Sequence, residues 1–291
     1  MNVKEKLEKK LSCERSMIRH KVLTFFMVIF LFPSTCYAAP NKEIWKRWTK
    51  HAPQSEQKID HQSWNTFLQR NVLVGHDGIN RIDYANVPRA DRRNLKYYIE
   101  YLAAVTIGQY RKAEQLAYWI NLYNALTVRL VIKNYPVGSI KDIDISPQFF
   151  SNGPWGKKFF EVEGIPISLN DIEHRILRPI WRDPRIHYVL NCASLGCPNL
   201  QPIALTARNG QAILEAAAKE FINHPRAVLV TRKGLILSSL YKWYAEDFGG
   251  KDEKIIFHIL RFANLQLRNR LKQHNKISDY QYDWALNLGR L

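Results

Sequence analysis

The segment RKAEQLAYWINLYNALTVRLVIKNYP, Arg111–Pro136, is the longest stretch of the sequence with helical periodicity. Apolar residues occupy nearly all of its circumference, which is typical of a helix buried on every side. Pro136 cannot continue a helix, and Lys133 in the last turn places a cation at the negative end of the helix dipole. The sequence therefore predicts a long buried central helix over about residues 111–134.

Polar residues interrupt this apolar helix on one face. Glu114 and Asn121 are separated by close to two full turns, and Asn124 lies one turn beyond Asn121. A buried carboxamide costs roughly 1–3 kcal/mol when its hydrogen-bonding groups stay unpaired. The Asn121/Asn124 stripe must therefore contact another polar element. Either it hydrogen-bonds a neighbouring loop and fixes the shape of that loop, or it lines a binding pocket.

The rest of the chain alternates helices with short hairpins. Asp91–Val105 and Ala207–Pro225 have helical periodicity, whereas FFEVEGIPISL and AVLVTRKGLILSSL have the pattern of hairpins. IHYVLNC, Ile186–Cys192, is expected to be a buried strand. Because the strands come in hairpins and not in strand–helix–strand crossovers, the predicted fold class is α+β. The fold is expected to be predominantly helical, with the central helix packed against a small sheet built from hairpins.

SLND, Ser168–Asp171, matches the capping-box pattern and predicts a short helix over DIEHRILR. This helix carries Glu173, His174 and Arg178. His174 and Arg178 are four positions apart and face each other, whereas the neighbours Glu173 and His174 do not. The histidine is either a packing residue of the core or a catalytic base.

Residues 1–38 contain the three parts of a signal peptide. MIRHK is basic, VLTFFMVIFLF (Val22–Phe32) is apolar, and STCYA ends in small residues at Ala38. The apolar run is shorter than the roughly 20 residues of a membrane-spanning helix. We expect cleavage after Ala38 and an exported protein, periplasmic or secreted, without a transmembrane anchor after cleavage. Met17 is a more usual start for such a signal than Met1.

Residues 39–291 are predicted to form a single globular domain, since they contain no Gly/Ser linker, low-complexity tract or repeat. They hold 36 Lys and Arg against 23 Asp and Glu, a net charge of +13, where the whole chain carries +17. Two explanations stay open: a basic surface without a specific partner, or contact with an anionic envelope surface or polymer. Nucleic acid is not expected as a partner of an exported protein.

Two of the four cysteines remain after cleavage, Cys192 and Cys197 in HYVLNCASLGCPNL (His187–Leu200). They form a disulfide, as an oxidising compartment allows, or one of them is a nucleophile with His174 as its base. Metal binding is the third alternative, but a second ligand pair at a zinc spacing is absent from the sequence. We therefore predict no metal and no cofactor. G-x-S-x-G, H-E-x-x-H and Gly-rich phosphate loops are absent as well.

Six segments occur in a characteristic order: DGINRIDYANV, AYWINLYNALTVRLV, NYPVGSIKDI, SLNDIEHRILRP, DPRIHYVLNCASLGCPNL and EFINHPRAV. In this order they resemble the domain of unknown function 547 family, in its bacterial exported form, over about residues 64–262. The resemblance implies a shared fold and no particular reaction. Plant relatives are fused to glutaredoxin-like modules, which suggests a redox or thiol role, and some relatives have serine where Cys197 stands. The family's marked positions correspond here to Trp119, Asn121, Tyr123, Asn124, Glu173, His174, Arg178, His187, Cys192, Cys197 and Pro198.

We hypothesise that the asparagine stripe, the helix with Glu173 and His174, and the cysteine loop converge on one site. As an enzyme, the protein would be a thiol-dependent hydrolase or acyl transferase, with loop amides stabilising an oxyanion. The alternative is a non-catalytic envelope binding or scaffold domain with a structural Cys192–Cys197 disulfide. The candidate catalytic residues are Cys192, Cys197, His174 and Glu173, and the candidate binding residues are Asn121, Asn124, Arg178 and His187.

Overall fold

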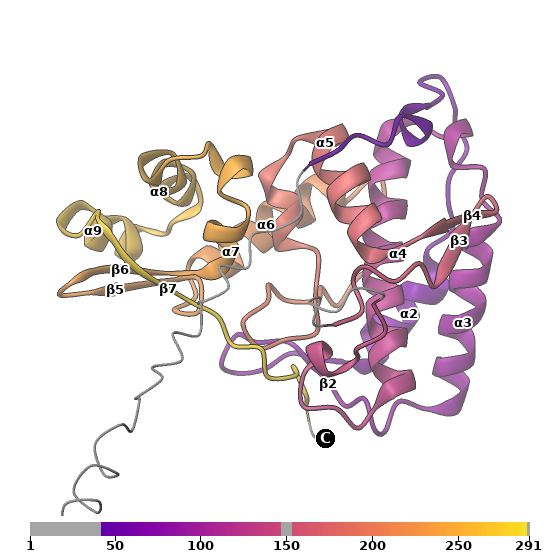
Figure 1. Cartoon of the computed structure of the whole chain (residues 1–291), viewed down its shortest axis with the longest axis horizontal. Coiled ribbons are helices and arrows are strands. Elements are labelled where there is room, and N and C mark those ends of the chain that lie inside the picture. The colour runs from indigo at the N-terminus through magenta and orange to yellow at the C-terminus, as the bar shows by residue number, and fades with distance from the viewer. Residues whose placement is uncertain (1–41, 147–152, 290–291) are drawn as a thin grey trace, which may run out of the picture. The chain divides into compact units, whose positions relative to one another are not determined.

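The central helix α4 runs from Lys112 to Asn134 in the computed structural model of the protein, which describes residues 42–146 and 153–289. Trp119, Ile120 and Leu122 are completely buried, and helix α3 (Arg89–Ala103) packs along α4 (Figure 1). The helix ends where Tyr135-Pro136 leaves the helical conformation. The predicted buried central helix is thus confirmed, because an apolar circumference leaves it no stable place at the surface.

The predicted α+β class, mainly helical, is also confirmed. The described strands form three small sheets: the hairpins β1–β2 and β3–β4, and a sheet of order β5-β6-β7. The last strand, β7, was not predicted from the sequence. It joins β6 in parallel, far along the chain from the predicted β5–β6 hairpin.

The helical elements, with η for 3-10 and π segments, are η1 Lys46–Thr49, α2 Gln62–Asn71, α3 Arg89–Ala103, η2 Ile107–Gln109, α4 Lys112–Asn134, η3 Ile140–Asp142, η4 Asp171–Leu177, α5 Arg178–Trp181, η5 Pro184–Tyr188, α6 Gly210–Ile222, α7 Ser239–Trp243, η6 Ala245–Phe248, α8 Asp252–Phe262 and α9 Leu265–Gln273. The strands are β1 Val72–Leu73, β2 Arg81–Ile82, β3 Phe160–Val162, β4 Ile165–Ile167, β5 Val228–Thr231, β6 Gly234–Ser238 and β7 Ile277–Gln281.

The capping box at Ser168–Asp171 is formed as the sequence predicts. The Ser168 N–H and hydroxyl both donate to Asp171 Oδ2, at 3.0 and 2.9 Å, and the Asp171 N–H donates to Ser168 Oγ at 3.1 Å. The segment that follows is a π-helix, Asp171–Leu177, which continues into α5. Such π segments are rare and often occur at functional sites.

The expectation of a strand at Ile186–Cys192 is wrong. Residues Pro184–Tyr188 form a 3-10 helix, whose first turn is capped by the Asp183 side chain, and the following residues are irregular. The physical reason is that a side chain supplies the hydrogen-bond partners that a neighbouring strand would otherwise supply. Asn124 of α4 bonds the backbone of this segment, so its polar groups are satisfied without a sheet.

The C-terminal segment lies along the cysteine loop, residues 192–197. The Leu195 and Gly196 N–H groups each donate to this segment at 2.8 Å, to the carbonyls of Ala285 and Asp283. A Cβ on Gly196 would come within 2.7 Å of the Asp283 nitrogen, so only glycine permits this approach. Backbone pairing that no local pattern predicts thereby joins the cysteine loop to residues 283–285.

The predicted signal peptide, residues 1–38, lies outside the described residues, and export stays a prediction. Within the described ranges, no helix combines the length and the apolar character that a membrane crossing requires.

Candidate functional site

The asparagine stripe of α4 holds two loops. Asn124 Nδ2 donates to the Val189 carbonyl at 2.8 Å, and the Asn191 N–H donates to Asn124 Oδ1 at 2.9 Å. Asn121 makes the same pair of bonds with the backbone of Leu205, at 2.8 and 3.1 Å. Of the two interpretations of the stripe, the structure shows hydrogen bonding that fixes loop shape. Asn124 thereby places the cysteine loop against the central helix.

A buried ion cluster lies beside the cysteine loop; it consists of Glu173, His174, Arg178, His187 and Asp247. His187 Nε2 lies 2.8 Å from Asp247 Oδ2, and its Nδ1 lies 3.6 Å from Glu173 Oε1. Arg178 Nε donates to Asp247 Oδ2 at 2.6 Å and its NH1 group to His174 Nδ1 at 2.9 Å. The predicted contact between His174 and Arg178 is therefore confirmed. The imidazole of His187 stands between two carboxylates.

The protonation states in the cluster follow from these contacts. Burial opposes the charged form of His187, but the bonds to Asp247 and Glu173 outweigh it and raise the pKa of His187. Burial also opposes ionisation of Glu173, yet the histidines and Tyr244 lower its pKa to about 2. For His174, burial is the largest effect and, with the Arg178 charge, it outweighs the opposing charge of Glu173 and lowers the pKa to about 4. The carboxylates thus favour the charged form of His187, whereas His174 is neutral at neutral pH and its Nδ1 accepts from Arg178.

Two tyrosines connect the ion cluster to the cysteine loop. The Tyr123 hydroxyl of α4 donates to Glu173 Oε2 at 3.3 Å, and the Tyr244 ring lies 4.0 Å from the ring of His187 between centroids. The charges of Glu173 and Cys192 both raise the pKa of Tyr123 and of Tyr244, after the larger effect of burial. The tyrosines therefore lie within electrostatic reach of both groups.

Cys192 is a half-buried free thiol surrounded by hydrogen-bond donors. Its Sγ lies 3.0 Å from the Tyr282 hydroxyl and 3.3 Å from Ser194 Oγ. The pKa of Cys192 is lowered, first by its hydrogen bond with the Cys197 side chain and then by the Ser194 and Tyr282 hydroxyls, although burial acts in the opposite direction. These donors stabilise a thiolate, the form in which cysteine is nucleophilic.

Cys197 has the opposite environment. Only 4% of it is exposed, and its Sγ lies 3.6 Å from the Leu190 carbonyl while accepting the Cys192 N–H at 3.0 Å. Burial, followed by the neighbouring Cys192, raises the pKa of Cys197 well above its ordinary value. Both cysteines are free thiols in the structure, so the disulfide that the sequence left open is not formed in it. The two residues are nevertheless direct neighbours, joined by the Cys192 N–H bond to Cys197 Sγ.

The backbone N–H groups of the cysteine loop mostly have acceptors within the chain. An oxyanion site built from these amides, as we expected from the sequence, would need donors that are free. The bonded groups are Cys192 N–H to Cys197 Sγ, Ala193 N–H to Asn191 Oδ1, Leu195 N–H to the Ala285 carbonyl, Gly196 N–H to the Asp283 carbonyl and Cys197 N–H to the Ser194 carbonyl. The expected oxyanion role of the loop is therefore not supported by its geometry.

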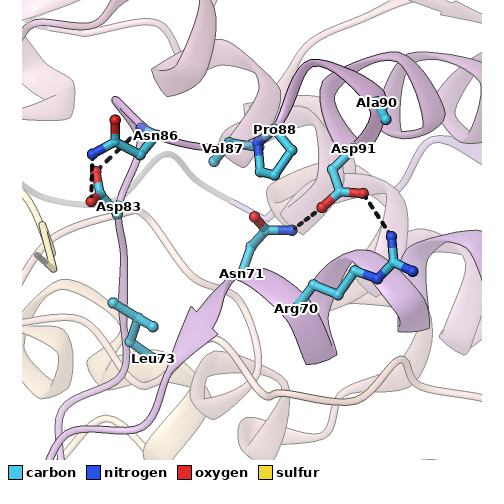
Figure 2. A pocket seen from close by; sticks show the side chains of 9 residues that line it. All are labelled: Arg70, Asn71, Leu73, Asp83, Asn86, Val87, Pro88, Ala90 and Asp91. Atoms are coloured by element: carbon cyan, nitrogen blue, oxygen red, sulfur yellow. Dashed lines mark hydrogen bonds and ion pairs between the residues drawn. The ribbon is translucent and has the colours of Figure 1, made fainter. Parts of the chain in front are cut away.

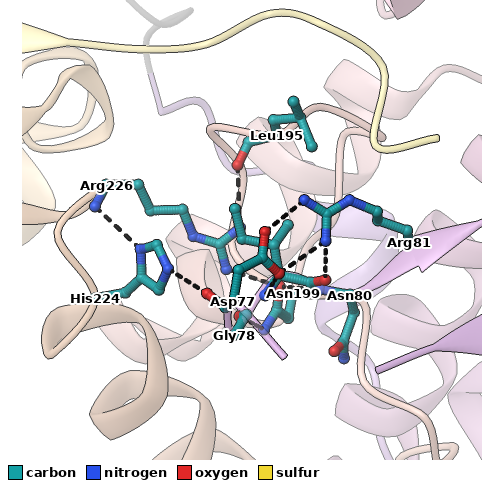
Figure 3. A network of polar contacts seen from close by, with 9 residues as sticks. Asp77, Gly78, Asn80, Arg81, Leu195, Asn199, His224 and Arg226 are labelled. Carbon is teal, nitrogen blue, oxygen red and sulfur yellow. Dashed lines mark hydrogen bonds and ion pairs between the residues drawn. The ribbon is translucent and has the colours of Figure 1, made fainter. Parts of the chain in front are cut away.

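The cysteine loop has a strained backbone at Ala193 and is held in place by hydrogen bonds from Arg226. Ala193 has φ of 57°, in the left-handed region that favours glycine, and such outliers cost of order 1–3 kcal/mol and cluster at functional sites. Figure 3 shows Arg226 reaching the loop, where it donates to the Leu195 carbonyl at 3.0 Å and to Asn199 Oδ1 at 2.7 Å. His224 and Asp77 continue this network to the β1–β2 connection. The surrounding contacts keep the loop in its strained shape.

The structure brings the three predicted segments together in part. Asn124 bonds the backbone just before the cysteine loop, and Tyr123 of the same helix bonds Glu173, but no histidine nitrogen bonds either sulfur within the described ranges. His174 as the base of Cys192 is therefore not supported, because its Nδ1 accepts from Arg178. Asp247 and Tyr282 were missed. Neither stands in a recognisable motif, and they reach the site from 60 and 90 positions away.

Neither a metal-binding cluster nor the pocket between α2 and α3 adds to the candidate site. Among the residues that the structure describes, no group of three or more His, Cys, Asp or Glu side chains is placed to hold a metal ion. A pocket of about 280 Å³ lies between α2 and α3 (Figure 2), where Asn71 and Arg70 both contact Asp91. It contains none of the predicted site residues, and its buried carboxylate already has partners.

The central part of the chain matches a known family model. Residues 107–222 match the family model described as Protein of unknown function, DUF547. The resemblance that the sequence suggested is confirmed, over a shorter range than the expected 64–262. The DUF547 segment contains α4, η4 and the cysteine loop, and hence every candidate residue predicted from the sequence, while Asp247 and Tyr282 lie outside it. Searches among the curated proteins and among the solved structures found no match.

Proposed function

We propose that the protein is a thiol-dependent enzyme that exchanges thiols and disulfides, with Cys192 as the nucleophile and Cys197 as the resolving thiol. The observation that carries the proposal is that the two cysteines adjoin, with Cys197 Sγ accepting the Cys192 N–H at 3.0 Å, and yet have unlike surroundings. Cys192 is half-buried with a lowered pKa, and Cys197 beside it is buried with a raised pKa. Such asymmetry is typical of redox cysteines, in which an accessible thiolate stands next to a resolving thiol.

The exchange proceeds in two balanced steps. The Cys192 thiolate attacks one sulfur of an external disulfide, forms a mixed disulfide and expels the other sulfur as a thiolate. Cys197 then loses its proton and attacks Cys192 Sγ, which releases the second thiolate and leaves a Cys192–Cys197 disulfide. The protein dithiol is oxidised and the external disulfide is reduced to two thiols. In reverse, the same steps oxidise an external dithiol.

This reaction needs little that the site does not supply. The first step requires no separate general base, because the donors around Cys192 already favour the thiolate, and in the second step the thiolate released from the substrate takes the proton of Cys197. It requires no oxyanion site, and the loop amides are occupied. The predicted export supports the proposal, because disulfides are substrates available outside the cytoplasm. So does the fusion of similar domains to glutaredoxin-like modules. Serine in place of Cys197 in some relatives implies that those relatives use a single nucleophile.

The test is a titration with a small pyridyl disulfide, followed by the absorbance of the released thiopyridone. The full chain is used, with Cys13 and Cys36 changed to Ser so that the two site thiols are the sole reactants. We expect two thiopyridones per protein, because resolution by Cys197 releases the second. Cys197→Ser should release one and keep a mixed disulfide detectable by mass, and Cys192→Ser should react slowly.

Three outcomes would contradict the proposal. Faster reaction of Cys197 than of Cys192 would reverse the assigned roles. A stable mixed disulfide in the protein with both thiols would exclude Cys197 as resolving thiol. Two sulfurs that stay unreactive until prior reduction, and whose reduction merely lowers stability, would indicate the non-catalytic binding or scaffold domain with a structural disulfide.

Thiol-dependent acyl transfer or hydrolysis is the second candidate, and the two hydroxyls at the sulfur favour it. Tyr282 and Ser194 contact Cys192 Sγ and each other, at 3.0 Å between their oxygens, so either could protonate a leaving group. A short-chain thioester is the suitable probe. A burst of released thiol together with an acyl adduct on Cys192 would support this candidate, and its absence in a protein that still exchanges disulfides would eliminate it.

A further inference from the structure

A second cavity, separate from the cysteine loop, is lined mainly by cationic side chains. It has a volume of about 390 Å³ and lies between the end of α5, the start of η5 and the last turn of α8. Arg182, Arg185 and Arg261 line it, together with His258 and the single carboxylate of Asp183. With His258 neutral, these lining groups carry two net positive charges.

Two of the three arginines are not neutralised by the chain. Arg185 pairs with Asp183 at 2.7 Å and with Glu215 at 3.6 Å. Arg182 and Arg261, by contrast, are exposed and take part in no ion pair within the described ranges. Like charges gathered in one concave wall attract a counter-ion, because the field is focused there more strongly than on an open surface.

The backbone conformation of Arg182 also supports a binding role for this cavity. Arg182 follows the last residue of α5 with φ of 52° and ψ of 32°, the left-handed conformation in which glycine usually ends a helix. A residue with a side chain is strained there. Arginine at this position places a guanidinium at the cavity mouth, which a glycine could not do.

His258 reports the positive field inside the cavity. Its Nε2 lies 3.0 Å from the Tyr188 hydroxyl, and burial, followed by the charge of Arg261, lowers its pKa to about 4. The apolar part of the wall comes from Trp181 and Phe262. The cavity thus combines a cationic rim with two aromatic rings.

We propose that this cavity binds an organic phosphate monoester, with the phosphate held by Arg182 and Arg261 and the organic part against Trp181 and Phe262. A phosphate dianion matches the two net charges, and guanidinium groups present paired donors that fit its oxygens. The volume exceeds what inorganic phosphate alone would fill, so the aromatic wall remains for the rest of the ligand. The site is independent of the thiol chemistry proposed for Cys192.

The experiment is calorimetric titration of the full chain at constant ionic strength with three probes: inorganic phosphate, phenyl phosphate and acetate. We expect saturable binding of phenyl phosphate, weaker binding of inorganic phosphate, and weakest binding of acetate, which carries a single charge. Inorganic phosphate that binds as tightly as phenyl phosphate would show that the aromatic wall contributes nothing and that free phosphate is the ligand. Acetate binding as tightly as either would overturn the assignment to phosphate.

Matched variants locate the binding. Arg261→Gln and Arg182→Gly should each weaken phenyl phosphate binding by roughly 10-fold or more, since each removes charge-assisted hydrogen bonds. Arg182→Gly also relieves the left-handed strain, so it should unfold no more easily than the unaltered protein, and lost binding would not reflect lost folding. Arg232→Gln, at an exposed arginine in the β5–β6 turn, is the control and should bind normally.

Cys192→Ser should also bind phenyl phosphate normally, which separates this proposal from the thiol function. Two results would refute the cavity: no saturable heat with either phosphate probe, or equal binding by the unaltered protein, Arg182→Gly and Arg261→Gln.

Discussion

The buried ion cluster and the cysteine loop lie side by side and use their polar groups in opposite ways. In the ion cluster every charge has a partner: His187 stands between Glu173 and Asp247, and Arg178 joins Asp247 to His174. In the cysteine loop most backbone N–H groups are bonded, and the sulfur of Cys192, a residue of intermediate exposure, is surrounded by donors that favour its anion. Saturated charges hold a fold together, whereas a stabilised thiolate is the nucleophilic form of cysteine.

This difference separates residues that the sequence had placed in one catalytic group. Glu173 and His174 belong to the saturated cluster, and the proposed reactive element is the pair of thiols. We therefore expect changes in the ion cluster to alter mainly the free energy of unfolding, and changes around Cys192 to alter mainly thiol reactivity.

Acidification should destabilise the protein strongly. The pKa values of His61, His174 and His258 are lowered to about 4 by burial, so between pH 6.5 and 4 the unfolded chain binds protons that the native state excludes. Stability from these histidines is complete above pH 6.5 and falls as pH falls, by ~3 kcal/mol for each at most. Glu173, with a pKa of about 2, adds a further loss below about pH 4.5. His187 opposes the trend, since its raised pKa contributes stability below 6.5 that is lost as pH rises.

Urea unfolding at a series of pH values measures this dependence. The decline between pH 6.5 and 4 should shrink in His258→Gln, which removes one of the three histidines whose pKa is lowered. A free energy of unfolding that stays constant over this window would show that these histidines do not titrate as their burial requires.

Asp247→Asn should destabilise the protein by ~3–5 kcal/mol, because it leaves the buried Arg178 guanidinium without its carboxylate and His187 Nε2 without its charged partner. Denaturant unfolding measures the loss. The rate of Cys192 with the pyridyl disulfide, measured on the native protein, should change less than about 3-fold, which is under ~0.7 kcal/mol. The exposed Asp279→Asn is the matched control and should leave both quantities unchanged. A large loss of thiol reactivity without a loss of stability would show that the ion cluster contributes to the reactivity of Cys192.

Asn124→Ala should destabilise the protein by ~2–3 kcal/mol, since the Val189 carbonyl and the Asn191 N–H both lose a buried partner. Asn134→Ala, at the exposed end of the same helix, removes one local bond to the Leu130 carbonyl and should have a much smaller effect. Unfolding curves of both variants make the comparison. Equal losses would mean that Asn124 does not position the cysteine loop.

Tyr282→Phe should raise the pKa of Cys192 and slow its reaction at neutral pH by ~10-fold, about 1.4 kcal/mol, because one donor to the thiolate is lost. The rate of alkylation as a function of pH measures the shift directly. Tyr280→Phe, two positions away in β7, is the control. An unchanged pH profile would show that the hydroxyl does not stabilise the anion, and the reactivity would then depend on Cys197 and Ser194 alone.

Sequence patterns predicted the structure correctly where the contacts involve residues close together in the chain. The periodicity of residues 111–134, the capping box at Ser168–Asp171 and the pairing of His174 with Arg178 involve residues within a few turns of one another. The expected strand at Ile186–Cys192 failed for the complementary reason. Its apolar residues are buried as predicted, but a side chain of α4 and not a neighbouring strand satisfies its backbone.

Periodicity and short motifs, which are properties of neighbouring residues, were enough to predict the central helix, the hairpins, the family match and the two thiols that the proposed function needs. The surroundings of those thiols could not be predicted in this way. Asp247 meets His187 across 60 positions, and Tyr282 meets Cys192 across 90. Packing of distant segments sets such contacts, and the same packing moves the pKa of one cysteine down and of the other up. Burial and hydrogen-bond partners, not residue type, make the two thiols different.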